Sequence, residues 1–260
     1  MTPLLILVLG VKPTLAIGTD LAYGAITKSL GAWRHLRLGH VNLRLSFWLG
    51  LGSIPGSLLG VSLVDWLHRA GPADVDTIML RALAVTLLLV SLSMVVGSPH
   101  SCPVTEKLTG RGKVWAVTIG LAVGIVLGLT SVGSGALIGL ALIGFFRLAP
   151  RRVVGTDVFH AAVLLWVAGL AHWRLGNVDL RLMGNMLLGS LPGVWLGSGA
   201  TAKISTRILR LTMAMVLLAS GLGLLAKSGL ALPPAVILGV PICLGLILAR
   251  YSRLDLAEAI

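Results

Sequence analysis

Charge is scarce in this chain, and acidic charge is scarcest. Only 12% of the 260 residues are charged, and nine Asp and Glu residues stand against 21 Lys and Arg. Soluble domains carry about twice that charged fraction. By contrast, 56% of the residues are hydrophobic and the mean hydropathy is +0.97. The composition therefore predicts a membrane protein with no room for a soluble domain.

Cysteine is also rare, because Cys102 and Cys243 are the only two. They form no C-x-x-C pair and have no histidine cluster nearby, so we expect neither a disulfide nor a metal site. No G-x-x-x-x-G-K-[ST] motif occurs, which argues against ATP hydrolysis, and we expect no cofactor. The net charge is +12, and the basic residues that produce it lie in loops between the apolar runs, as orientation in a membrane requires. Nucleic acid is therefore not an expected partner.

Apolar runs of about 20 residues alternate with short charged loops, and this length crosses a hydrocarbon core of roughly 30 Å. The first ten residues lack the features of a signal peptide and are interpreted as part of a membrane helix. The expected fold is all-α, with about eight or nine transmembrane or re-entrant helices. The expected spans are 14–33, 45–64, 78–97, 153–171, 182–200, 208–226 and 230–249, with interrupted apolar stretches at 1–11 and 114–147.

The chain contains an internal duplication. Residues 17–60 align without a gap onto 154–197, at an offset of 137, with 19 identities in 44 positions. Polar residues match too, because IGTD with Asp20 corresponds to VGTD with Asp157, and GSIPGSLLG corresponds to GSLPGVWLG. Such repeats are typical of many transporter folds. The expected organisation is one membrane domain over 1–260, with a first repeat at 1–113, a second repeat at 114–229 and an extra helix and tail at 230–260.

The second repeat begins with a Gly-rich segment that the first repeat lacks. A helix with Gly120, Gly124 and Gly128 leads into LTSVGSGA at 129–136, and the matching residues of the first repeat would precede residue 1. We therefore expect the upstream coding sequence, if read through, to supply a further Gly-rich helix. An in-frame stop directly before Met1 would contradict this expectation.

In the order of these motifs the sequence resembles the sulfite exporter TauE/SafE family, also called the toluene sulfonate uptake permease family. The resemblance covers nearly the whole chain, from MTPLLILVLGVKP through the IGTD and GSIPGSLLG segments to LTSVGSGAL, VGTD and GSLPGVWLGS. It implies a secondary transporter in the cell membrane for sulfite, organosulfonates or related small sulfur-containing anions, moved with a proton-linked gradient. The G-x-G-G-G segment that the family carries before the first proline is absent here.

The segment LTSVGSGA is the candidate binding site for the anion. Its small polar residues interrupt a helix, and irregular backbone at membrane depth is tolerated only where protein or water satisfies it. A half-helix beginning near Ala136 would present the positive end of its dipole to an anion. The alternative is a glycine kink that serves close packing. The expected anion-binding residues are Thr130, Ser131, Gly133, Ser134 and Gly135, with Ser53, Ser190 and Lys28 as further candidates.

Asp20 and Asp157 are the candidate proton carriers. Apolar surroundings disfavour the charged form of a carboxyl group unless a cation or hydrogen bonds hold it. Tyr23 and His160 follow these acids by three residues and so share a helix face with them, which suits a proton relay. The alternative is that each acid, with the threonine before it, caps the N-terminus of its own helix.

Other features have more than one interpretation. Lys28 has no basic counterpart, because Leu165 occupies the matching position. There are three interpretations of Lys28: it holds the anion, it neutralises an acid of the other repeat, or it snorkels to the interface near Arg34. The loops 34–44 and 172–181 place His and Arg just outside two spans, as an anion funnel or as topology and headgroup contacts. The glycines of GSIPGSLLG and GSLPGVWLG recur at every fourth position and let helices approach closely.

Loop charges favour a hairpin for the broken segment. If 114–147 enters the membrane and returns, most Lys and Arg fall on one side of the membrane. The loop 34–44 and the C-terminus are then cytoplasmic, as the positive-inside rule requires. On this topology the two repeats have inverted orientations.

Two other classes of protein are alternatives to a transporter. One is a non-transporting membrane scaffold or subunit. The other is an intramembrane hydrolase that uses Ser131 or Ser134, although the G-x-S-x-G elbow is absent. The expectation is a transporter that is not an enzyme.

Overall fold

All regular structure in the described part of this computed structural model is helical. The described residues are 1–70, 75–96, 110–132, 135–146, 148, 150–201 and 206–244. In chain order the helices are α1 (Thr2–Leu7), α2 (Pro13–Arg37), α3 (Leu43–Ala70), α4 (Val75–Val96), α5 (Gly110–Thr130), α6 (Ala136–Gly144), α7 (Pro150–Arg174), α8 (Leu180–Thr201) and α9 (Thr206–Lys227). A further short helix spans Pro234–Leu244.

Four of the described helices, α3, α4, α5 and α7, are long and apolar enough to cross a membrane. Shorter apolar helices cover Leu211–Lys227, within α9, and Pro234–Leu244. The expected spans before residue 230 correspond to α2, α3, α4, α7, α8 and α9. Of the expected span 230–249, residues 245–249 lie outside the described residues. The chain is a polytopic, all-α membrane protein, as its sequence predicts.

The N-terminal segment forms a short helix. Of the apolar stretch 1–11, Thr2–Leu7 are helical, a length that does not cross a bilayer by itself. Leu5 and Ile6 of α1 are buried against residues of α4 and α9. Lys227 at the end of α9 donates to the Ile6 carbonyl at 2.7 Å, which satisfies one of the carbonyls left unpaired at the C-terminus of α1.

The broken segment folds back on itself. α5 ends at Thr130, Ser131 adopts a positive φ of 59°, and α6 begins at Ala136. Phe145, which follows α6, stacks on Trp115 near the start of α5, with 5.9 Å between ring centroids. α5 and α6 therefore run antiparallel, in agreement with the predicted hairpin. α6 has nine residues, so it spans only about 14 Å and is too short to cross a bilayer alone.

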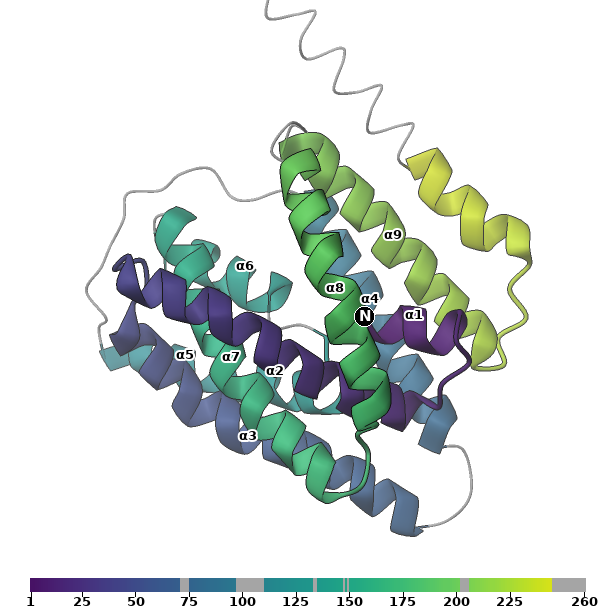
Figure 1. The fold of residues 1–260 in the computed structure, drawn as a ribbon, viewed down its shortest axis with the longest axis horizontal. Coiled ribbons are helices and arrows are strands. Elements are labelled where there is room, and N and C mark those ends of the chain that lie inside the picture. Colours follow the sequence, from purple (N-terminus) through teal and green to yellow (C-terminus); the bar gives the residue numbers. More distant parts are fainter. Residues whose placement is uncertain are drawn as a thin grey trace, which may run out of the picture.

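The matching helices α2 and α7 pack side by side (Figure 1) and run antiparallel. The amide of Asn42, which follows α2, donates to the Thr156 hydroxyl at 3.0 Å. Under the 137-residue offset the same bond recurs, because the Asp179 amide donates to the Thr19 hydroxyl at 3.0 Å. The start of each helix thus lies beside the end of the other, so α2 and α7 have the opposite orientations that the loop charges predict.

Glycines set the contact between α3 and α5. A Cβ at any of six glycines would overlap a backbone carbonyl of the opposite helix, and these are Gly52, Gly56 and Gly60 on α3 and Gly120, Gly124 and Gly128 on α5. The close approach predicted for GSIPGSLLG is therefore confirmed. In the second copy the environment of Gly189 is described, and a Cβ there would meet nothing within 4 Å, so this position makes no such contact.

We expect Gly124→Val to destabilise the protein by about 1–3 kcal/mol, because the new side chain overlaps the Ser53 carbonyl. Gly184→Val is the matched control, since that glycine of α8 has nothing within 4 Å of a Cβ. Thermal unfolding of the detergent-solubilised protein, followed by circular dichroism, measures the difference. Equal unfolding temperatures for the two variants would contradict the packing of α3 on α5.

Candidate functional site

The repeated Gly-Thr-Asp triplets have a direct structural explanation. A Cβ at Gly18 would overlap the Asn177 carbonyl, and a Cβ at Gly155 would overlap the His40 carbonyl. The threonine of each triplet accepts the loop amide already described. The first two residues of each triplet therefore hold the loop of the opposite repeat. We call these two contacts the loop clasps.

The aspartates are not caps of their own helices. α2 begins at Pro13 and α7 at Pro150, so Asp20 and Asp157 lie about two turns inside these helices. A capping residue would lie just before the first residue of each helix, about two turns N-terminal to each aspartate. The alternative capping interpretation is therefore wrong for α2 and for α7.

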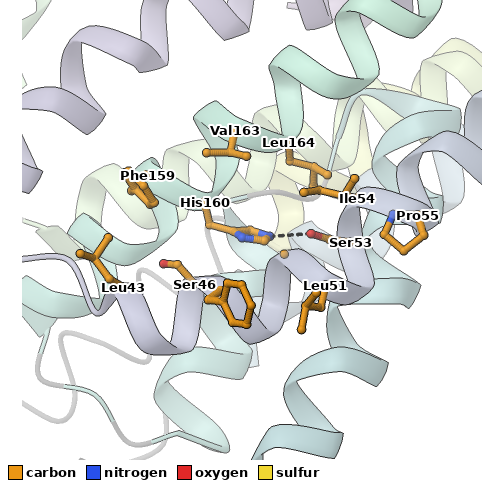
Figure 2. A pocket seen from close by; sticks show the side chains of 12 residues that line it. Leu43, Ser46, Leu51, Ser53, Ile54, Pro55, Phe159, His160, Val163 and Leu164 are labelled. Atoms are coloured by element: carbon orange, nitrogen blue, oxygen red, sulfur yellow. Dashed lines mark hydrogen bonds between the residues drawn. The ribbon is translucent and has the colours of Figure 1, made fainter.

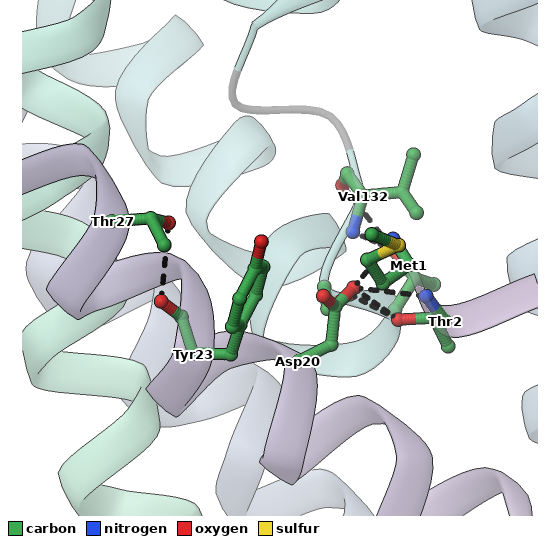
Figure 3. Close-up of polar contacts among 8 residues, drawn as sticks. Met1, Thr2, Asp20, Tyr23, Thr27 and Val132 are labelled. Atoms are coloured by element: carbon green, nitrogen blue, oxygen red, sulfur yellow. Dashed lines mark hydrogen bonds and ion pairs between the residues drawn. The ribbon is translucent and has the colours of Figure 1, made fainter. Parts of the chain in front are cut away.

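Asp20 is the centre of a hydrogen-bonded cluster that joins α1, α2 and the end of α5 (Figure 3). Its Oδ2 accepts from the Thr2 amide at 3.0 Å and from the Thr2 hydroxyl at 2.6 Å. It also accepts from the Ser131 hydroxyl at 2.9 Å, and the α-amino group of Met1 lies 3.3 Å away. The carboxylate thus ties the short helix α1 to the helix break. Figure 3 shows Tyr23 on the same side of α2 as Asp20.

Asp157 occupies the matching place beside α6. Gly135 is the N-cap residue of α6, and a Cβ there would lie 3.7 Å from the Oδ2 atom of Asp157. The Oδ1 atom of Asp157 is buried and has no hydrogen-bond partner within the described segments. Each acid therefore lies at the N-terminal end of a short helix, α1 for Asp20 and α6 for Asp157.

Lys28 connects the two acids electrostatically. Its side chain is half-buried in α2, and it lies within electrostatic range of the negative charges of Asp157 and Asp20. This placement favours the interpretation in which Lys28 neutralises an acid of the other repeat, and it argues against snorkelling to the interface near Arg34. Because Leu165 stands at the matching position of α7, the repeat symmetry is broken at this cation.

The helix break is described in part. The Thr130 hydroxyl donates to the Val126 carbonyl at 2.7 Å and accepts from the Val132 amide at 3.3 Å, so it closes the last turn of α5. The predicted break in the helix is confirmed, and the predicted half-helix starts at Ala136. Three residues singled out in the sequence, Gly133, Ser134 and Cys102, lie outside the described residues.

His160 faces a different partner from the one that its spacing predicts. Its Nε2 atom lies 3.1 Å from the Ser53 hydroxyl, and both side chains are buried between α7 and α3. Asp157, one turn earlier, lies against Gly135 instead. The Ser190 hydroxyl donates to the Leu187 carbonyl of its own helix at 3.0 Å. The structure thus places Asp20 against Ser131 and Asp157 against Gly135, at the two sides of the helix break. It pairs Ser53 with His160 elsewhere.

Sequence reasoning missed His172. The loop interpretation places this residue outside a span, but α7 continues to Arg174 and His172 is fully buried. Its Nε2 atom lies 3.0 Å from the Gly128 carbonyl near the end of α5. His172 therefore anchors α7 to the helix that carries the break. The alignment of the repeats did contain a signal for this role, because His172 matches His35. A histidine that recurs in both repeats is more readily explained by a structural contact than by a position in a loop.

The Ser131 hydroxyl contacts Asp20 and the Thr2 hydroxyl, and the bond to Thr2 is 2.6 Å long. A serine nucleophile needs an adjacent general base, usually a histidine or a lysine. These contacts argue against the hydrolase alternative for Ser131.

The antiparallel repeat helices, the broken helix and the paired acids are the features of a membrane transporter with inverted repeats. Residues 1–224 match the family described as Sulfite exporter TauE/SafE. The chain belongs to this family, as the order of its motifs predicts.

Curated relatives agree with this assignment. The chain is 38% identical over 232 residues to the probable membrane transporter protein YjnA of Bacillus subtilis (strain 168), covering 86% of this chain and 90% of the relative. It is 27% identical over 213 residues to the probable membrane transporter protein YdhB of the same strain, covering 81% and 84%. The probable membrane transporter protein ORF9 of Sinorhizobium sp is 26% identical over 232 residues, covering 85% and 81%. No solved structure matches the chain.

Proposed function

We propose that this membrane transporter is a secondary, proton-coupled carrier of a small sulfur-containing anion, such as sulfite or an organosulfonate, across the cell membrane. Membership of the sulfite exporter family supports the class of anion. The observation that carries the proposal is the placement of Asp20 against Ser131 and of Asp157 against Gly135, one acid at each side of the helix break. The break between α5 and α6 lies beside the same two acids.

The charges of this cluster account for coupling. When Asp20 and Asp157 are both charged, they neutralise Lys28 and repel an entering anion. Protons on the acids remove this repulsion, and the positive charge of Lys28 then attracts the anion. The Ser131 hydroxyl and the N-terminal end of α6 add a hydrogen-bond donor and a positive dipole. An anion and its protons therefore occupy the site together.

The inverted repeats supply alternating access. The loop clasps lie at opposite ends of the antiparallel helices, one at Thr19 and one at Thr156. Rocking of one repeat against the other about a central site exposes that site first to one side of the membrane and then to the other. The two clasps are the contacts that such a motion loosens in turn.

Uptake into liposomes tests the proposal. We expect purified, reconstituted protein to take up labelled sulfite or methanesulfonate when a proton gradient points in the same direction, and a protonophore to abolish this uptake. Protein-free liposomes are the control. If folded protein moves none of the sulfur anions tested, the proposal fails and the scaffold alternative is favoured.

A further inference from the structure

A second candidate site lies between α3 and α7, where a groove encloses about 430 Å³ (Figure 2). Its walls are almost wholly apolar, and Phe47, Leu51 and Val163 on its rim are 61%, 48% and 40% exposed. Both helices are long and apolar enough to cross the membrane. The exposed rim therefore faces hydrocarbon, and the groove opens sideways toward the lipid.

Inside this groove lie three polar side chains. Ser53 and His160 bond to each other, and His160 also bonds to the backbone of Ser46. Ser46 is only 6% exposed, and its hydroxyl has no hydrogen-bond partner in the part of the chain that the structure describes. A buried hydroxyl without a partner is unfavourable. A hydrogen-bond acceptor on a ligand in the groove would satisfy the Ser46 hydroxyl.

The end of the groove at Leu43 and Ser46, which we call its mouth, lies at the start of α3, and arginines are exposed at the starts of both helices. Arg44 in the first turn of α3 and Arg151 in the first turn of α7 are both exposed. The starts of the two helices lie together, because Gly155 contacts His40 just before α3. Both helices also direct the positive ends of their dipoles to this side. Ser46 lies one turn inside, between the positive mouth and the apolar floor.

We propose that this groove binds one anionic phospholipid of the bilayer. The phosphate lies against Arg44 and Arg151, an ester carbonyl accepts a hydrogen bond from Ser46, and one acyl chain covers the Ser53 and His160 pair. A phospholipid presents a charge, an ester and a hydrocarbon chain in this order, and the positive mouth selects an anionic headgroup. A free anion leaves the apolar part of the groove empty.

Comparison of the two repeats identifies Gly50 as the residue that keeps the groove open. Gly50 lines it, and a Cβ at Gly50 would meet nothing within 4 Å. Its counterpart in the other repeat is Leu187, and the counterpart of Ser46 is Met183. Gly50→Leu therefore fills the groove with the residue that the other repeat carries, without a backbone clash.

Native mass spectrometry of the full chain, titrated with phosphatidylglycerol or with phosphatidylcholine of identical chains, tests the proposal. We expect one bound phosphatidylglycerol, with phosphatidylcholine at least about tenfold weaker. Gly50→Leu should weaken phosphatidylglycerol binding by at least about tenfold. The matched control Gly189→Leu, on α8 with nothing within 4 Å of a Cβ, should bind as the wild type does.

A second variant keeps the proposal testable if Gly50→Leu does not fold. Arg44 is exposed, so Arg44→Gln is expected to keep the fold and to reduce the preference for phosphatidylglycerol. Equal binding of the two lipids by the wild type overturns the proposal, and so does an unchanged preference in Arg44→Gln. Glycerol 3-phosphate is not expected to compete, and competition by it would overturn the lipid in favour of a free phosphate.

Discussion

Asp157→Asn is expected to reduce sulfite uptake driven by a pH gradient by at least about tenfold. Asparagine keeps the shape of the side chain beside Gly135 but cannot carry a proton. Exchange of labelled for unlabelled sulfite without a gradient should persist, because exchange needs no net proton movement. The measurement is the pair of initial rates, driven uptake and exchange, in the same liposome preparation.

Asp65→Asn is the matched control for this variant. Asp65 is a partly exposed acid on α3, and it pairs with Arg69 at 2.8 Å. It is not part of the hydrogen-bonded cluster around Asp20. The control should transport as the wild type does. If Asp157→Asn keeps the driven uptake of the control, Asp157 carries no coupled proton and serves only as a contact with α6.

Lys28→Met is expected to abolish exchange as well as driven uptake. Methionine preserves the length and apolar stem of Lys28 but removes the charge that the proposal assigns to the anion. This outcome differs from that of Asp157→Asn, so the two variants separate anion binding from proton coupling. Lys28→Arg should restore part of the exchange, because it retains the positive charge.

The control for Lys28 is Lys113→Met. Lys113 lies at the start of α5, and its ammonium group lies over the ring of Trp48 on α3, 5.1 Å from the ring centroid. Its transport rates and its apparent affinity for sulfite should equal those of the wild type. An unchanged KM for sulfite in Lys28→Met would show that the anion binds elsewhere.

Repetition and small residues made most of the fold predictable. The glycines of GSIPGSLLG predict the contact between α3 and α5 because a helix surface without side chains permits close approach. LTSVGSGA predicts the break because glycine and serine destabilise a helix interior. The loop charges predict the hairpin because charged side chains stay out of hydrocarbon. Each prediction depends on a local property of the chain.

The misses depend on neighbours that the sequence does not reveal. Of the apolar residues 1–11, Leu5 and Ile6 are buried against other helices, whereas Leu4, Leu7, Val8 and Leu9 are exposed. Apolarity alone does not distinguish side chains that face protein from side chains that face lipid. Three-residue spacing places Asp157 and His160 on one broad face, but the neighbouring helix that covers each residue decides its partner. α3 reaches His160 through Ser53. The roles assigned to these residues in transport stay predictions.

The loop clasps have a thermodynamic consequence. Each clasp consists of one glycine against a carbonyl and one amide-to-threonine bond of 3.0 Å, so equivalent contacts hold the two ends of the antiparallel helices. In the proposed cycle, neither end therefore gains a contact of this kind that the other end lacks. The ion and substrate gradients set the direction of net transport by such a carrier, so the same molecule would run either way.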